Sequence, residues 1–166
     1  MTSKPVLSAR EFWRLIVEFV VMRVADVPVA AALTDLAEII DGRNLQVRPL
    51  PNLPSPFLGI ARRCGHVIPV VDVAALMNRT GREHPKVGGQ VVVMNLRAGS
   101  VGLSVDEIST IVAVEPGDIA ALCPGSWSSQ GLVMAHAVDL TDGQAGIIDP
   151  AALEQILNTL VPRRSG

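Results

Sequence analysis

The sequence predicts a mainly β fold built from two related halves, and three observations support this. Residues 70–76 read Val-Val-Asp-Val-Ala-Ala-Leu, and residues 147–153 repeat the phrase as Ile-Ile-Asp-Pro-Ala-Ala-Leu. Short β-branched runs separated by turn residues recur about nine or ten times, a spacing typical of barrels and sandwiches. Of the 166 residues, 49% are apolar and 18% are charged, which allows a real core and leaves apolar surface exposed. Such a duplication favours a scaffold that presents surfaces over an enzyme with one catalytic cleft.

The chain is expected to open with a tail and a β-hairpin. Residues 1–12 are interpreted as a flexible tail. The stretch 13–24 is rich in apolar, β-branched residues, and most of it predicts a long strand, preceded by a helical turn over 9–13. Ala25-Asp26 is a plausible turn into a second strand over 27–31. Pro28 in that strand indicates an edge position, because proline cannot donate a ladder hydrogen bond.

A short helix, a connector and a series of strands follow. Thr34 can cap a helix over 35–40, with Leu36, Ile39 and Ile40 on its apolar side. Four prolines between 49 and 56 predict a rigid, extended connector. Further strands are expected over 57–61, 67–71, 90–96, 101–105, 109–114, 132–138 and 145–148.

Helical structure is expected at three later places. Residues 74–77 and 116–121 are interpreted as short helical turns. Pro150 is suited to the first turn of a final helix, because its missing N–H costs little there. An apolar stripe follows at helical spacing, which predicts that this helix docks on a core. The stripe contains Leu153, Ile156, Leu157, Leu160 and Val161.

Composition narrows the classes of function. The net charge is −2, the isoelectric point is about 5.9, and aromatic residues make up 3% of the chain. The chain therefore has few residues that could neutralise phosphates or stack on bases, and no nucleic-acid partner is expected. Two cysteines make no disulfide framework, which fits a reducing cytoplasm. Charged residues interrupt the N-terminal apolar stretch, so neither a signal peptide nor a membrane span is expected.

Three aspartates end apolar runs: Asp72, Asp106 and Asp149. One interpretation is a carboxylate site for magnesium or acid–base catalysis, as in a metal-dependent hydrolase. The other is turn chemistry, in which each aspartate accepts backbone N–H groups where a strand ends. Nothing in the spacing brings the three together, so the turn interpretation is favoured.

Zinc and thiol chemistry are weakly indicated. Cys64 and His66 lie two residues apart, and Cys123 with His136 would complete a zinc site. The chain has no paired ligand spacing of the usual kind, so a zinc site is not expected. A Cys–His catalytic pair is also not favoured, because no third residue that orients the histidine is identifiable. We therefore expect no metal and no cofactor.

Four segments in order resemble the CheW-like domain family of bacterial chemotaxis: residues 50–60, 65–73, 101–108 and 143–150. The resemblance covers residues 15–160. It implies a mainly β fold of two intertwined, five-stranded SH3-like barrels with short helices and a C-terminal helix. It further implies one domain over 13–162, made of two barrel subdomains, and no catalysis.

The resemblance also implies a function. CheW-like adaptors join methyl-accepting chemotaxis receptors to the regulatory domain of a CheA-type histidine kinase, in the cytoplasm beneath membrane-associated arrays. The receptor surface would lie on the strand and turn at 57–66, with Ile60, Arg62, Arg63 and Cys64 as partner-binding residues, and the kinase would bind an apolar barrel face.

One position departs from the family pattern. The family usually has Asn-Leu-Arg-Gly at this turn, and here Cys64 occupies the arginine position. This departure favours a divergent or accessory adaptor, in a non-flagellar chemosensory pathway. The alternatives are the metal-dependent hydrolase and a kinase-binding paralogue that has lost receptor coupling.

Overall fold

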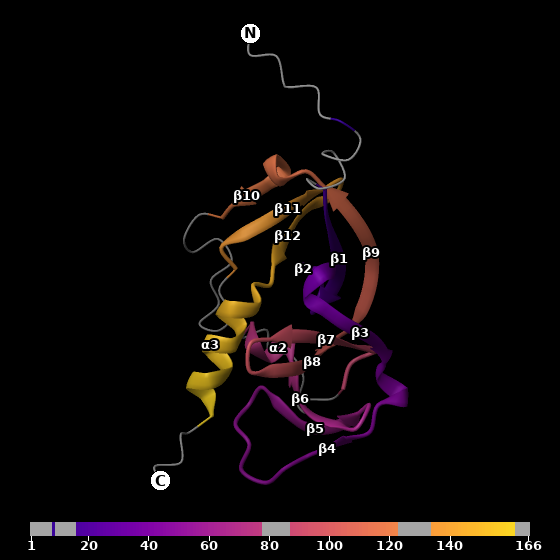
Figure 1. The fold of residues 1–166 in the computed structure, drawn as a ribbon, viewed down its shortest axis with the longest axis vertical. Helices are drawn as coiled ribbons and strands as arrows, with labels where there is room; N and C mark the ends of the chain where they lie inside the picture. Colours follow the sequence, from indigo (N-terminus) through magenta and orange to yellow (C-terminus); the bar gives the residue numbers. More distant parts are fainter. Residues whose placement is uncertain (1–7, 9–15, 78–86, 123–133, 162–166) are drawn as a thin grey trace.

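The computed structural model describes residues 8, 16–77, 87–122 and 134–161. Within them, two six-stranded sheets dominate (Figure 1). Sheet A has the strand order β10-β11-β12-β2-β1-β9, and sheet B has the order β3-β7-β8-β6-β5-β4. The strands are β1 (Val17–Val24), β2 (Val27–Ala32), β3 (Leu36–Asp41), β4 (Val47–Arg48), β5 (Phe57–Arg63), β6 (His66–Asp72), β7 (Gln90–Leu96), β8 (Gly99–Val105), β9 (Glu107–Val114), β10 (Ile119–Ala121), β11 (His136–Leu140) and β12 (Gly143–Ile147).

The chain passes from one sheet to the other and back. Strands β1 and β2 belong to sheet A, β3 to β8 form sheet B, and β9 to β12 return to sheet A. Short helical pieces accompany the strands: 3-10 turns at Leu33–Asp35, Gly42–Asn44 and Pro116–Asp118, α2 (Val73–Leu76) and α3 (Pro150–Leu160). The mainly β, intertwined fold is thus confirmed. Each sheet counts six strands because the short β4 and β10 extend it.

The continuous apolar runs in the sequence correspond to strands that are buried on both faces. In β1, Val20 and Met22 enter a core shared by the two sheets, whereas Phe19 and Val21 face a separate core inside sheet A. Strand β7 does the same in sheet B, where alternate residues enter the shared core and a third core. The shared core is completed by α3, whose Leu153 is fully buried. Figure 1 shows α3 alongside both sheets.

The repeated sequence phrase has the same local structure in both copies. Strand β6 runs parallel to β8, and β12 runs parallel to β2. β6 ends at Asp72, and Asp149 follows two residues after β12; each aspartate caps the helix that comes next. The Asp72 Oδ1 atom accepts the Ala74 N–H at 3.0 Å, and the Asp149 Oδ1 atom accepts the Ala151 N–H at 3.3 Å. Both carboxylates therefore satisfy helix N-termini, as the turn interpretation predicts.

Two local predictions are wrong. Residues 36–41 form strand β3 rather than a helix, because they pair with β7 along their length, Ile40 lying opposite Val91. Helical structure is limited to the 3-10 turn Leu33–Asp35, which has no side-chain cap. Strand β2 is internal rather than an edge, but its pairing with β12 begins at Val29, so Pro28 need not donate to β12.

Several boundaries differ from expectation. Residues 116–118 form a 3-10 turn, but the following residues form β10 rather than more helix. The expected tail at 1–12 lies outside the described residues apart from Ser8, and so does Cys123. The start of the strand expected over 132–138 is also outside them.

Candidate docking surface

The predicted partner-binding residues gather at the β5–β6 hairpin. Cys64 and Gly65 form its tip, with φ angles of +48° and +80°. This left-handed pair is the backbone that a two-residue hairpin turn requires, and glycine adopts it without a steric penalty. Arg62, Arg63 and Cys64 are all exposed there, and Cys64 is a free thiol.

The two arginines lie on opposite faces of sheet B, because successive residues of a strand alternate. Ala61 is buried in the core inside sheet B, so Arg63 shares that inner face. Arg62 shares the outer face with Ile60. Strand pairing places Arg62 opposite Val67, so these two side chains also lie on the same face.

Arg63 is engaged within the chain. Its Nε atom donates to the Glu38 carboxylate oxygens at 3.1 and 3.0 Å, and its Nη2 atom also contacts that carboxylate. The pair joins β5 to β3, which are the last but one and the first strand in the order of sheet B, so it links two strands that are not hydrogen-bonded neighbours. The hydrogen bonds from Arg63 lower the pKa of Glu38. Arg62 has no ion pair with any residue in the described part of the chain.

An apolar groove of about 390 Å³ lies on the outer face beside this hairpin, and we call it the Ile60 groove. Three of the five large apolar side chains that are exposed in the described residues line it: Leu50 (42%), Val67 (58%) and Val161 (48%). Gly59 also lines it, and a Cβ atom at this position would come within 2.2 Å of the Arg48 carbonyl oxygen. Such a concentration of apolar surface is typical of a protein–protein contact.

Of the four predicted partner-binding residues, only Ile60 lines this groove. Arg62 lies beside it on the same face, and Arg63 faces away. The walls come from the proline-rich connector, from the β7–β8 turn and from the end of α3. Leu50 and Val161 carried a signal in the sequence only as large apolar residues, one in the proline-rich connector and one directly after α3. Val101, Leu103 and Val105 of β8 are fully buried and belong to the shared core.

The three aspartates do not form a common site. Asp72 and Asp149 cap α2 and α3, whereas Asp106 Oδ2 accepts the Ala25 N–H at 2.8 Å. In the part of the chain that the structure describes, no group of three or more His, Cys, Asp or Glu side chains is placed to hold a metal ion. No described helix is long and apolar enough to cross a membrane.

Two sheets that share one core and carry an apolar groove beside a charged hairpin define a two-barrel β protein with a candidate docking surface. The profile of the CheW-like domain matches residues 18–156, and the chain belongs to this family. Over 71 residues it is 35% identical to the chemotaxis protein CheW of Rhizobium meliloti (strain 1021). This stretch makes up 43% of this chain and 45% of that protein.

The match to a solved structure covers more of the fold. The scaffolding protein TtCheW of Thermoanaerobacter tengcongensis superposes with a TM-score of 0.69 over 80% of this chain and 88% of its own. The two sequences are 18% identical, so this likeness shows the fold alone.

Proposed function

We propose that this chain is a non-catalytic chemotaxis adaptor that couples methyl-accepting receptors to the regulatory domain of a CheA-type histidine kinase. The observation that carries the proposal is the CheW-like match over residues 18–156. The described carboxylates support it too, since the three aspartates are used in backbone hydrogen bonds rather than in a shared site.

The Ile60 groove and Arg62 form the receptor surface in this proposal. An apolar groove suits an amphipathic helix, whose apolar residues recur on one face. Arg62 lies on the groove side and has no ion pair among the described residues, so its charge is available to a partner carboxylate. Arg63 is committed to Glu38 and supports the barrel instead.

The adaptor acts by shifting populations. An adaptor that holds both partners transmits a signal only if it binds one receptor state more tightly than the other. Cys64 stands where the family usually has arginine, and we propose a divergent or accessory adaptor in a non-flagellar pathway that sits at membrane-associated arrays.

The first experiment titrates the full chain calorimetrically with the isolated kinase regulatory domain from the same genome. We expect saturable, micromolar binding, and no binding would refute the kinase assignment. A parallel titration uses the cytoplasmic tip of a receptor from that genome. Kinase binding without receptor binding would instead support the paralogue that has lost receptor coupling.

A pair of arginine variants tests the receptor surface. Arg62→Glu should weaken receptor binding by about tenfold, because it reverses a charge beside the groove. Arg63→Gln is the comparison on the other face; it also removes the pair with Glu38, so circular dichroism first checks that it is folded, and it should then leave receptor affinity within about twofold. Equal losses in both variants would contradict the assignment of Arg62.

A further inference from the structure

Strand β9 presents an open edge in sheet A. In the described residues it is hydrogen-bonded to β1 alone, so every second residue directs its N–H and C=O groups outward. Natural edges are protected by lysine, proline or bulges. β9 has neither lysine nor proline, and its bulge lies near its start, opposite the Val21–Met22 step of β1. The stretch from Thr110 to Val114 is regular, and Ile111 is 55% exposed.

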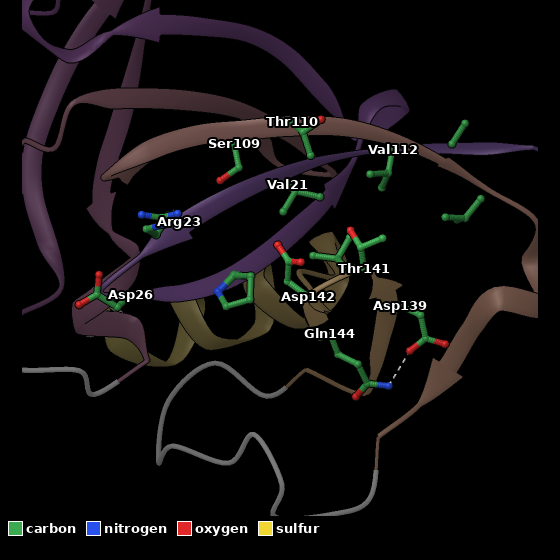
Figure 2. A pocket seen from close by; sticks show the side chains of 15 residues that line it. Val21, Arg23, Asp26, Ser109, Thr110, Val112, Asp139, Thr141, Asp142 and Gln144 are labelled. Carbon is green, nitrogen blue, oxygen red and sulfur yellow. Dashed lines mark hydrogen bonds between the residues drawn. The ribbon is translucent and has the colours of Figure 1, made fainter.

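A cavity of about 770 Å³ lies beside this edge, between β9 and the β11–β12 turn (Figure 2). Ligand sites commonly enclose roughly 300–1,000 Å³. Its inner wall is apolar and includes Val21, Val112, Val114 and Leu140.

The mouth of the cavity is acidic. Asp26, Asp139 and Asp142 lie among the lining residues, and Figure 2 shows them spread along the cavity from the β1–β2 turn to β11. Asp139 accepts a hydrogen bond from the Gln144 side chain at 2.8 Å. Arg23 is the one cation in the lining, and it is already paired with Glu107 at 3.4 Å. A ligand at this mouth therefore meets a net negative charge.

We propose that the β9 edge and this cavity bind an extended segment of a partner protein that carries apolar and then basic residues on one face. The segment adds to β9 as a strand, so its backbone pairs with the outward N–H and C=O groups. Its inward apolar side chains pack against Val112 and Val114, which lie on one face of β9 and line the cavity. Its inward basic side chains reach the carboxylates at the mouth.

Charge identifies the partner as a protein of different sequence. A second copy of this chain that paired through β9 would bring Glu107 as the strand's one charged residue, and this would add negative charge to an acidic mouth. The site lies on sheet A, whereas the Ile60 groove is formed by sheet B and α3, so one surface can be lost without the other.

The test uses two fluorescein-labelled peptides and the full chain. The first peptide, Val-Thr-Val-Thr-Lys-Thr-Lys, places valine and lysine on one face of a strand. The second replaces both lysines with glutamate. Fluorescence anisotropy should give an affinity about tenfold higher for the lysine peptide, as expected for complementary charge. N-methylation of alternate amides on one edge should abolish its binding, because strand addition needs those N–H groups.

Variants of the protein test whether the peptide binds at this cavity. The double variant Asp26→Asn, Asp142→Asn should weaken the lysine peptide by about tenfold. Asn tolerates the left-handed backbone at Asp26, where φ is +64°, so the turn is kept. Asp118→Asn is the matched control, since Asp118 is exposed and does not line the cavity. Amide NMR shifts should concentrate in residues 107–114 and 139–144.

Four results would overturn the proposal. They are equal binding of the lysine and glutamate peptides, undiminished binding of the N-methylated peptide, shifts confined to other residues, or no binding by either peptide. A protein that dimerises through β9 in sedimentation, with the peptide competing, would assign the edge to a second copy instead. Kinase titration is read separately, so the failure of one proposal does not imply the failure of the other.

Discussion

Replacing Asp106 with alanine should destabilise both sheets together, because Asp106 stands where the chain leaves β8 for β9. Its Oδ2 atom accepts the Ala25 N–H at 2.8 Å, and its own N–H donates to the Arg23 carbonyl at 3.0 Å. These bonds fix the β1–β2 turn of sheet A to the crossover from sheet B. Ala25 has a φ of +48°, a conformation that costs a non-glycine residue energy and needs support.

The magnitude follows from the groups involved. Alanine at position 106 leaves the partly buried Ala25 N–H without this acceptor, and loss of a hydrogen bond to a charged group costs about 2 kcal/mol. Asp106→Asn keeps an acceptor oxygen and should cost about half as much, near 1 kcal/mol. The backbone bond to Arg23 remains in both variants.

Urea unfolding monitored by circular dichroism measures these free energies. Asp139→Ala is the control, since its hydrogen bond to Gln144 is exposed and its loss should stay within about 0.5 kcal/mol. If Asp106→Ala is as stable as that control, or if the asparagine variant is the weaker of the two, the bond does not hold the crossover.

Two further predictions concern charge and packing. The pKa of Glu38 lies below its ordinary value of 4.5 because Arg63 donates hydrogen bonds to its charged form. The pair therefore contributes stability above pH 4.5, which is lost as the pH falls through the folded-state pKa. Arg63→Gln should return the Glu38 pKa toward 4.5 in an NMR titration, and an unmoved pKa would refute the pairing. Gly102→Ala should cost about 1–3 kcal/mol in urea unfolding, because its Cβ would lie 3.1 and 3.3 Å from two buried valine side chains; a neutral substitution would show that these valines yield.

Local signals predicted the parts of the fold that depend on neighbouring residues. The β5–β6 and β7–β8 hairpins follow from β-branched runs around short turns, and α3 follows from Pro150 and its apolar spacing. The local sequence predicted a helix where strand β3 lies, because Leu36, Ile39 and Ile40 fit a helical period equally well. Its state is decided by pairing with β7, which the local sequence does not contain.

At the candidate site, contacts between residues that are distant in the sequence limited what could be predicted. Alternation along β5 places Arg62 and Arg63 on different faces. The contact between Arg63 and Glu38, however, depends on how sheet B brings β5 near β3. Asp106 finds Ala25 across 81 positions of the chain, and no local pattern announces such a pair. The groove likewise joins a connector, a hairpin and the end of α3, so composition suggested exposed apolar surface without locating it.

The route of the chain has a consequence for its synthesis. The first hairpin, β1–β2, is finished early, yet its partners β9 and β12 are translated only after the whole of sheet B. At roughly 5–20 residues per second, a hairpin that is apolar on both faces waits several seconds for cover. Sheet B has all its strands in one continuous stretch and can form first, so it would act as the template on which the split sheet assembles. Nascent chains halted after β8 should therefore protect sheet B from proteolysis while β1 and β2 remain the preferred contact of a chaperone.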